Sequence, residues 1–311
     1  MDFFSILQNV SVLFFLIIVG YITGKTGIVS ENGQKELSGL VLKVTMPATI
    51  ILALQLDFTM ERFITALKIM LIVFLSYVGM IVLSKLASNF YKVDDGQRDV
   101  IQVAKVLPNT SFMGYPVVLA ILGREALFYA VLGAGLIFEI VAWTYGTYNI
   151  GRSTGKDFKD NLIKNILLSP GILSILIGFL LFILSIDIPE PIYTTMSILS
   201  QATSPLAMIV VGIILSRSDI VKCITSIRLY IISLFRILIF PLVIYLVLNV
   251  FQLTGMEIVI PVVMLSMPTA AYVAMFSTNL SNDANLASQI VFISSLLSIF
   301  TIPFIVLLVT R

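Results

Sequence analysis

The chain has 311 residues, of which 59% are hydrophobic and 12% are charged, with a mean hydropathy of +1.06 and a formal net charge of +2. This composition indicates a protein embedded in a bilayer and excludes an ordinary water-soluble globular domain. With no histidine and a single cysteine, the chain cannot form histidine-dependent nucleophilic sites, histidine-ligated metal sites or a disulfide framework. We therefore expect no enzyme, no cofactor, no metal and no nucleic-acid partner.

Ten apolar segments predict ten transmembrane helices. Each approaches the roughly 20 residues that a helix needs to cross the hydrocarbon of a bilayer. The segments are residues 5–24, 37–56, 63–84, 99–122, 126–149, 166–186, 192–215, 229–251, 258–280 and 286–309. The first has only Asp2 before it and no small-residue cleavage site after it, so we expect it to remain as a helix rather than to be removed as a signal peptide.

Basic residues divide unevenly between the connections, and this division predicts the orientation. The even-numbered connections and the two ends carry only Arg62, Lys68, Arg124 and Arg311. The odd-numbered connections carry the larger group: Lys25, Lys35, Lys85, Lys92, Arg98, Arg152, Lys156, Lys159, Lys164, Arg217, Lys222 and Arg228. By the positive-inside rule we expect a multi-pass protein of the cytoplasmic membrane with both termini outside. Cys223 would then be cytoplasmic.

Two proline-containing stretches recur in the second half of the chain. Thr45-Met46-Pro47 returns as Thr203-Ser204-Pro205, and the stretch 107–114 returns at 267–274. Because each half has an odd number of predicted spans, the two copies would be inverted in the membrane. We expect a first inverted repeat at 1–150, a cytoplasmic linker at 151–165 and a second inverted repeat at 166–311. Inverted repeats with interrupted helices are typical of secondary transporters.

The fourth and ninth segments carry the most informative interruption. A proline in a membrane helix removes one backbone hydrogen bond and frees a carbonyl, and polar residues follow it in both copies. A simple kink and capping of the half-helix by its own polar residues are alternative interpretations. The matched positions favour a site where two helix amide ends attract an anion. The predicted substrate-binding residues are Pro108, Asn109, Thr110, Ser111, Pro268 and Thr269.

The earlier proline pair is a weaker signal. Thr45 and Thr203 each stand two residues before a proline, Pro47 and Pro205. Contact with a ligand and close packing against a partner helix explain this pattern about equally well. Both threonines are therefore only candidate substrate or coupling residues.

Four ionisable residues lie inside predicted spans, where charge is costly and a functional role is the default hypothesis. Lys43 and Lys105 are close enough to the cytoplasmic ends for their side chains to reach the interface. Lys105 also lies one turn before Pro108, so it could instead add positive potential to the site. Glu139 and Arg236 lie deeper. A structural ion pair between these two residues and a proton-carrying role for Glu139 are the alternatives.

The chain resembles a known transporter family at these positions. The Asn-Thr-x-Phe-x-Gly-x-Pro pattern from Asn109 to Pro116, its proline-centred partner at Pro268 and the ten spans in two halves are similar to the auxin efflux carrier family. Bacterial members of that family are described as permeases of malate, malonate or other organic acids. The resemblance implies an all-α membrane fold in which spans 4 and 9 break and cross, spans 1, 2, 6 and 7 form a scaffold, and the other spans carry the substrate. The second copy departs from the pattern at Thr269 and Ala274.

The sequence thus predicts a secondary transporter of a small organic anion that works by alternating access in the lipid bilayer. One alternative is a sodium-coupled organic-anion symporter, because hydroxyls such as those of Ser111 and Ser266 can coordinate sodium. Another is a membrane sensor that binds a ligand without moving it. Gly20 and Gly24 suit helix contacts within one chain as well as between chains, so the sequence fits both a monomer and a homodimer.

Overall fold

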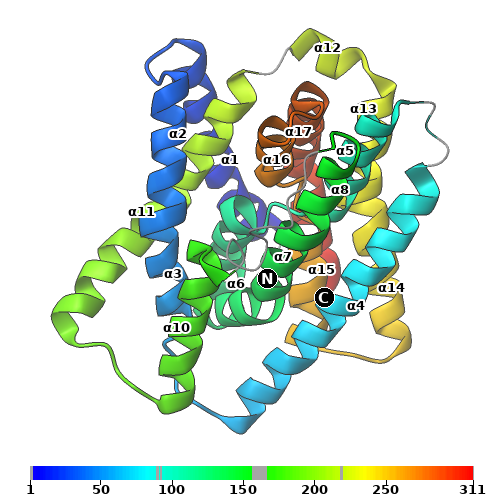
Figure 1. Cartoon of the computed structure of the whole chain (residues 1–311). Helices are drawn as coiled ribbons and strands as arrows, with labels where there is room; N and C mark the ends of the chain where they lie inside the picture. Colours follow the sequence, from blue (N-terminus) through cyan, green and yellow to red (C-terminus); the bar gives the residue numbers. More distant parts are fainter. Residues whose placement is uncertain (1–2, 89–90, 92, 156–166, 218–219, 311) are drawn as a thin grey trace.

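The computed structural model describes residues 3–88, 91, 93–155, 167–217 and 220–310 (Figure 1). Over these residues the chain is helical, with one isolated β-bridge and no strand, so the all-α prediction is confirmed. Six of the described helical segments are long and apolar enough to cross a bilayer: Glu31–Ala53, Met60–Ala87, Thr110–Arg152, Glu190–Ser216, Ile227–Val250 and Ala284–Val309. Shorter apolar helices cover Val10–Lys25, Pro170–Leu184 and Met256–Leu265.

The helices of the first half follow the predicted segments closely. They are α1 (Phe3–Lys25), α2 (Glu31–Leu40), the π-helical turn η1 (Val41–Thr45), α3 (Met46–Ala53), α4 (Met60–Ser88), α5 (Asp95–Val106), η2 (Thr110–Gly114), α6 (Tyr115–Tyr129), η3 (Ala130–Gly135), α7 (Leu136–Val141), η4 (Ala142–Gly146) and α8 (Thr147–Arg152). Inside α6 the chain turns sharply at Gly123, whose φ of 83° belongs to the left-handed region that glycine adopts freely. This turn separates the fourth predicted span from the fifth.

The second half contains a similar series. Its helices are α10 (Pro170–Leu184), α11 (Glu190–Ser216), α12 (Ile220–Thr225), α13 (Ile227–Leu234), the π-helical turn η6 (Phe235–Ile239), α14 (Phe240–Val250), α15 (Met256–Leu265), α16 (Ala271–Asn279) and α17 (Ala284–Val309). Most of the linker expected at 151–165 falls on residues 156–166, which lie outside the described residues. At its start, α8 continues through Arg152.

Three of the π-helical turns end two residues before a proline. Pro47, Pro116 and Pro241 are each the second residue of the α-helix that follows η1, η2 or η6. A proline ring clashes with the carbonyl four residues earlier and offers no N–H to it. A wider turn accommodates both defects without ending the helix. At these three positions a proline therefore follows local π-helix.

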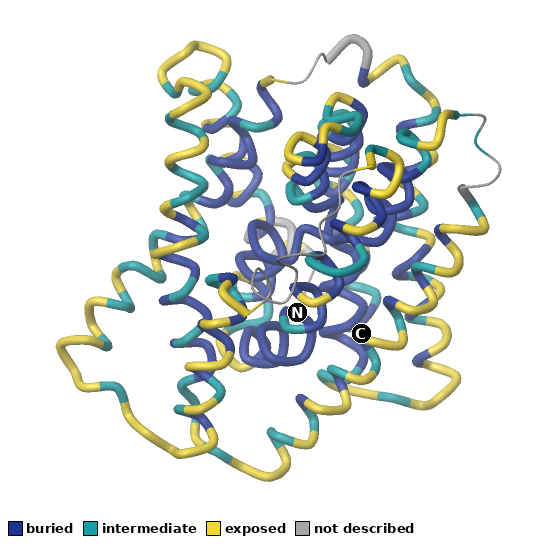
Figure 2. The backbone as a smooth tube through the Cα atoms, viewed as in Figure 1, coloured by how far each residue is buried: buried dark blue, intermediate teal, exposed yellow. Residues whose placement is uncertain are grey.

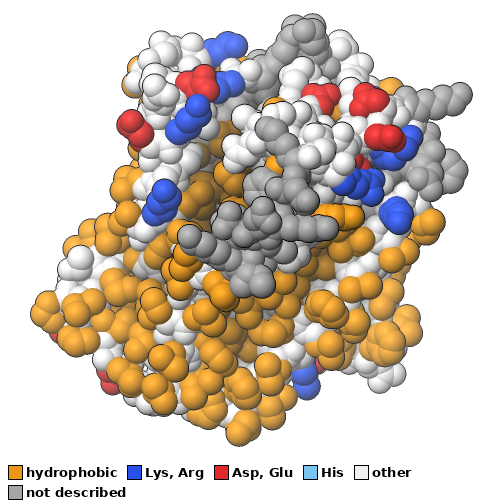
Figure 3. Space-filling view, viewed as in Figure 1, with side chains coloured by type: hydrophobic (Ala, Val, Ile, Leu, Met, Phe, Trp, Pro, Cys, Tyr) orange, Lys and Arg blue, Asp and Glu red, His pale blue; other side chains and the backbone are white. Residues whose placement is uncertain are grey.

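The core and the outer surface differ in the way that a bilayer requires. The α5–α8 region and α15 form the buried centre, and the outer helices expose one side (Figure 2). The exposed side chains are largely apolar, whereas most charged side chains visible in Figure 3 gather at one end of the molecule. The hydrocarbon of a bilayer solvates such apolar side chains, so their exposure on a membrane-facing surface does not destabilise the fold.

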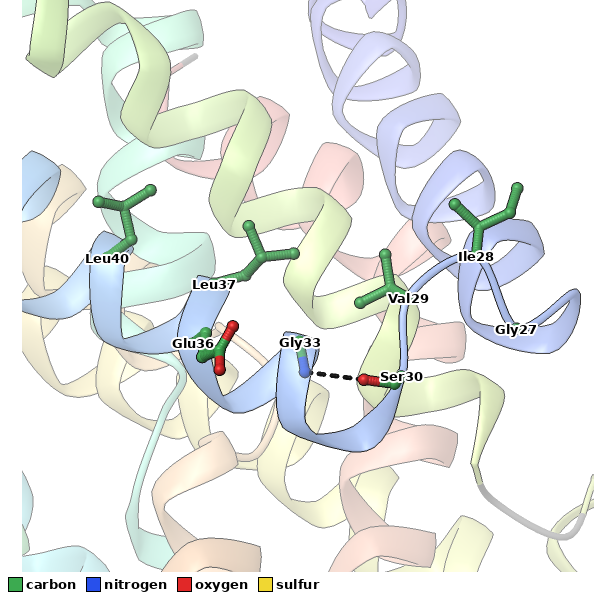
Figure 4. Close-up of a pocket in the computed structure, with 8 residues that line it drawn as sticks. All are labelled: Gly27, Ile28, Val29, Ser30, Gly33, Glu36, Leu37 and Leu40. Atoms are coloured by element: carbon green, nitrogen blue, oxygen red, sulfur yellow. Dashed lines mark hydrogen bonds between the residues drawn. The ribbon is translucent and has the colours of Figure 1, made fainter.

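The turn between α1 and α2 is held by a local cap. Ser30 accepts a hydrogen bond through Oγ from the Gly33 amide at 3.1 Å, as Figure 4 shows. This contact satisfies one of the free amides at the start of α2. The residues around the cap line a hollow of about 410 Å³ at the end of the molecule. None of the residues that line this hollow belongs to the interrupted helices.

Glycines allow α1 and α11 to pack backbone against backbone. A methyl group added at Gly20 would overlap the Ile209 carbonyl, and one added at Gly212 would overlap the Ile17 carbonyl. Gly24 lies against Ser216 in the same interface. Small residues commonly permit such close approach between membrane helices. Gly20 and Gly24 are therefore used for a contact within this chain.

We expect Gly212→Leu to destabilise the protein, because its side chain would have to displace the α1 backbone. Overpacking of this kind costs roughly 1–3 kcal/mol and sometimes more. Thermal unfolding of the detergent-purified protein measures the effect. Gly39→Leu is the matched control, because an added Cβ at Gly39 meets no atom within 4 Å. Equal unfolding temperatures for the two variants would contradict the observed packing.

Candidate functional site

Two interrupted helices cross at the centre of the molecule. The chain is extended between α5 and η2 and again between α15 and α16, and the two extended segments pair antiparallel at Pro108 and Thr269. The Asn109 amide donates to the Pro268 carbonyl at 2.7 Å, and the Ala270 amide donates to the Leu107 carbonyl at 2.9 Å. Each break therefore satisfies backbone groups that the other leaves free, as a water-free environment requires.

The first break is a tight local turn around Asn109. Its φ of −78° and ψ of 66° are those of an inverse γ-turn, and the Thr110 amide donates to the Pro108 carbonyl at 2.8 Å. The Asn109 carbonyl then accepts from the amides of Met113 at 3.2 Å and Gly114 at 2.9 Å. This turn starts the next half-helix immediately after the proline.

Thr269 holds the crossing together through its side chain and its backbone. Its hydroxyl donates to the Ala104 carbonyl at 3.0 Å, in the last turn of α5, and its amide donates to Ser294 Oγ at 3.1 Å. The residue is fully buried. Thr269 thus stabilises the end of the opposite half-helix, a contact between the two interrupted helices rather than a cap on its own helix.

Asn109 offers an unused donor beside this crossing. Its side chain is buried, and its Nδ2 has no hydrogen-bond partner among the described residues. A buried amide without a partner is costly, so such a group commonly bonds a ligand or an ordered water. Thr110 and Ser111, which follow it, are also buried.

A cavity of about 340 Å³ reaches the beginning of both half-helices. Ser111 of η2 and Tyr272 of α16 each stand second in their half-helix, and both line it. The opposite wall comes from η1, α3 and the start of α10. The full lining is Leu42, Lys43, Met46, Ser111, Glu139, Trp143, Leu168, Ser169, Pro170, Gly171, Tyr272 and Met275.

Glu139 faces this cavity without a cation partner among the described side chains. Trp143 Nε1 donates to its Oε2 at 3.2 Å, and the Tyr272 hydroxyl donates to its Oε1 at 3.4 Å. A Cβ added at Gly171 would lie only 3.0 Å from Oε1, so the first turn of α10 packs directly on the carboxyl group. The buried carboxyl group is held by neutral donors.

Arg236 makes a different contact, so the hypothesis of a Glu139–Arg236 ion pair is wrong. Its Nη1 donates to the Leu265 carbonyl at 2.6 Å, at the last residue of α15 before the break. That carbonyl is one of the groups that an interrupted helix leaves free, and it attracts a cation because of the helix dipole. Nε and Nη2 of this fully buried guanidinium have no partner within the described part of the chain.

Lys105 is buried rather than extended to the interface, so the hypothesis that its side chain reaches the interface is also wrong. Its Nζ lies 4.5 Å from the centre of the Tyr91 ring and 5.1 Å from that of the Phe235 ring. No described polar group bonds this Nζ. Aromatic faces stabilise a desolvated ammonium group through cation–π attraction. Lys105 therefore directs its ammonium group to Tyr91 and Phe235, although its backbone lies one turn before the first break.

Thr45 and Thr203 lie in the packed region of η1, α3 and α11. Thr203 is bonded through its hydroxyl to Thr49 Oγ1 at 2.8 Å, a contact that the sequence analysis missed. The Thr45 hydroxyl lies 3.5 Å from the Val41 carbonyl of its own helix. Neither threonine lines the cavity described above. Their visible role is packing between helices.

The sequence analysis also missed part of the cavity wall. Trp143 lies four residues after Glu139 and so shares its helix face, a spacing that could have pointed to the contact. Ser169 and Pro170 form a typical helix start, with Ser169 Oγ accepting from the Ile172 amide at 3.2 Å. Nothing in the local sequence indicates that this helix start would pack on Glu139, because the two segments are far apart in the sequence and come into contact only in the folded structure.

Comparison with known proteins identifies the family. Residues 5–306 match the family model described as membrane transport protein. An uncharacterized transporter of Methanocaldococcus jannaschii is 29% identical over 301 residues, which cover 94% of this chain and 95% of the relative. An uncharacterized transporter of Methanothermobacter thermautotrophicus is 25% identical over 308 residues, covering 97% and 98% of the two chains. The chain is a multi-pass membrane protein that belongs to the membrane transport protein family of auxin efflux carriers, which are transporters and not enzymes.

Proposed function

We propose that the protein is a secondary transporter of a small organic anion, such as a mono- or dicarboxylate, across the cytoplasmic membrane. The observation that carries the proposal is the cavity of about 340 Å³ reached by the first turns of both interrupted helices. The first amides of a helix lack partners within it and carry partial positive charge. Two such ends at one cavity favour an anion. The volume falls in the range of small-molecule sites.

Two buried cations strengthen the preference for an anion. Arg236 and Lys105 both lie in the interior, and no described carboxylate forms an ion pair with either. An uncompensated charge in a membrane interior is costly. A bound anion would lower that cost by Coulomb attraction through a medium of low dielectric constant. In this proposal Asn109 supplies the main side-chain donor to the substrate.

The proposed membrane arrangement is ten spans in two inverted halves, residues 1–150 and 166–311. The order of α5, break and α6 matches that of α15, break and α16. The antiparallel bridge between the breaks supports a two-fold relation between the halves. Such a relation explains why the two half-helix starts reach one cavity.

Alternating access would then act across the cavity. Its walls come from η1, α3 and α10 on one side and from η2, α7, η4 and α16 on the other. The resemblance assigns the first group to a scaffold and the second to a mobile bundle. Sliding of the bundle would carry the crossing and its ligand past the scaffold wall, changing the side from which the cavity opens.

Asn109→Ala is expected to weaken substrate binding by about 5- to 150-fold, because a hydrogen bond to a charged group contributes roughly 1–3 kcal/mol. The substrate is first identified by uptake of mono- and dicarboxylates into proteoliposomes, and its affinity is then measured by calorimetry. Thr269→Ala should instead mainly lower stability, because its hydroxyl is occupied by Ala104. Asn249→Ala is the control, since that side chain bonds its own helix at an exposed position. Unchanged affinity in Asn109→Ala would remove this residue from the site.

We further propose that Glu139 carries a coupled proton. An ionised carboxylate at the cavity would repel an anionic substrate, whereas a protonated one would not. Glu139→Gln should therefore abolish the dependence of uptake on a pH gradient while leaving substrate binding measurable. Glu125→Gln, which alters an exposed carboxylate near Arg62, should retain that dependence. Uptake driven by a sodium gradient and indifferent to pH would support the sodium-symporter alternative.

The proposed orientation needs introduced cysteines, because Cys223 itself is buried and so poorly suited to surface labelling. In a Cys223→Ser background, Asn32→Cys lies in an exposed part of an odd-numbered connection, and Thr254→Cys lies in an even-numbered one. An impermeant thiol reagent should label Thr254→Cys, but not Asn32→Cys, in intact cells. The opposite labelling pattern would reverse the orientation.

Measured flux separates transport from ligand sensing. A sensor would bind the anion in the same cavity but would not move it. Suppose that the purified protein binds a carboxylate, that Asn109→Ala weakens this binding, and that no flux occurs under pH, sodium or substrate gradients. This result would favour the sensor.

A further inference from the structure

A long apolar groove runs between α4 and α14 on the outer surface, and none of the contacts described above involves it. The groove has a volume of about 660 Å³. Its two walls are single helix faces, with side chains that recur every three or four residues. The lining residues are Lys68, Leu71, Ile72, Leu75, Ser76, Gly79, Leu83, Phe240, Val243, Ile244, Val247, Leu248, Phe251, Leu253 and Glu257.

The groove remains open because both walls pack on a third helix. The short helix α15, which leads to the second break, contacts both α4 and α14. All its residues from Ile258 to Leu265 are buried. Gly79 leaves the α4 wall without a side chain at mid-length, and an added Cβ there meets no atom within 4 Å. The unfilled space is therefore bounded by apolar walls that face the bilayer.

One end of the groove is charged. Lys68 Nζ bonds Glu257 Oε1 at 2.9 Å, and the Lys68 side chain is 55% exposed. Glu257 stands at the start of α15, directly after the connection that follows α14, so this end lies towards a membrane surface. The other end, near Leu83 and Phe240, is apolar. The groove therefore matches a lipid molecule, with a charged end for the headgroup and an apolar length for a hydrocarbon chain.

We propose that this groove binds one membrane lipid whose headgroup contains a phosphate and a primary amine. One hydrocarbon chain lies along the groove, the phosphate contacts Lys68, and the amine contacts Glu257. From Lys68 to Leu83 the α4 wall is about 22 Å long at 1.5 Å per residue. This exceeds half of the roughly 30 Å hydrocarbon thickness, so a chain from one leaflet fits within it. The bound chain fills the space between the apolar faces of α4 and α14.

Charge complementarity selects this headgroup. Because Lys68 and Glu257 already pair with each other, an anionic headgroup without an amine that contacts Lys68 would weaken this pair and repel Glu257. A choline headgroup carries the positive charge but has no N–H to donate to the carboxylate. Only a headgroup with both a phosphate and an N–H-bearing cation satisfies both residues, with charge-assisted hydrogen bonds at each.

Native mass spectrometry of the purified full chain tests the proposal, with dioleoyl phosphatidylethanolamine, phosphatidylglycerol and phosphatidylcholine added separately. We expect one phosphatidylethanolamine to bind about tenfold more tightly than either other lipid, as the loss of one charged hydrogen bond would give. Gly79→Leu should fill the groove and abolish this binding. Gly39→Leu is its control, because it adds the same side chain at another open position.

A second pair of variants tests the headgroup contact. Lys68→Gln should weaken phosphatidylethanolamine binding about tenfold. Lys35→Gln breaks an exposed ion pair with Glu31 elsewhere and should change nothing. Undiminished binding in Gly79→Leu would overturn the groove as the site. Equal or tighter binding of phosphatidylglycerol or phosphatidylcholine by the unaltered protein would overturn the headgroup assignment.

Discussion

Backbone groups that a membrane helix exposes must find partners inside the protein, and this constraint shapes the centre of the molecule. Two interrupted helices meet so that the Asn109 amide bonds the Pro268 carbonyl and the Ala270 amide bonds the Leu107 carbonyl. Thr269 and Arg236 satisfy two further carbonyls, at Ala104 and Leu265. Neither break could be stable in hydrocarbon alone. Their mutual pairing is what brings two helix starts to one cavity.

The distribution of charge around the crossing follows from the same constraint. Arg236 binds a carbonyl at the end of α15 and forms no ion pair with Glu139. Glu139 instead accepts hydrogen bonds from Trp143 and Tyr272 and packs against the first turn of α10. The interior thus keeps cations and a carboxyl group apart rather than joined in a salt bridge. Separated charges can each respond to a ligand or a proton, which is what the proposed coupling requires.

Packing differs between the two sides of the molecule in a way that suits the proposed motion. On one side, glycines lock α1 against α11 with backbone in contact with backbone. On the other, α4 and α14 leave a groove over α15 that the protein does not fill. A rigid pair of helices can act as the reference for movement. If the proposed lipid fills the groove, α4 and α14 can move without opening a void, because lipid chains rearrange easily.

Composition, periodicity and proline spacing were sufficient to predict an all-helical membrane protein interrupted near Pro108 and Pro268, because apolar length and missing backbone donors are local properties. The same patterns predicted polar residues at the breaks, of which Ser111 lines the cavity and Asn109 carries a buried donor without a described partner. Only the tertiary structure decided which groups pair. It joined Thr269 to Ala104, separated Glu139 from Arg236, and buried Lys105 between Tyr91 and Phe235. These contacts join residues distant in sequence, and their geometry depends on how the helices cross, which no local pattern encodes.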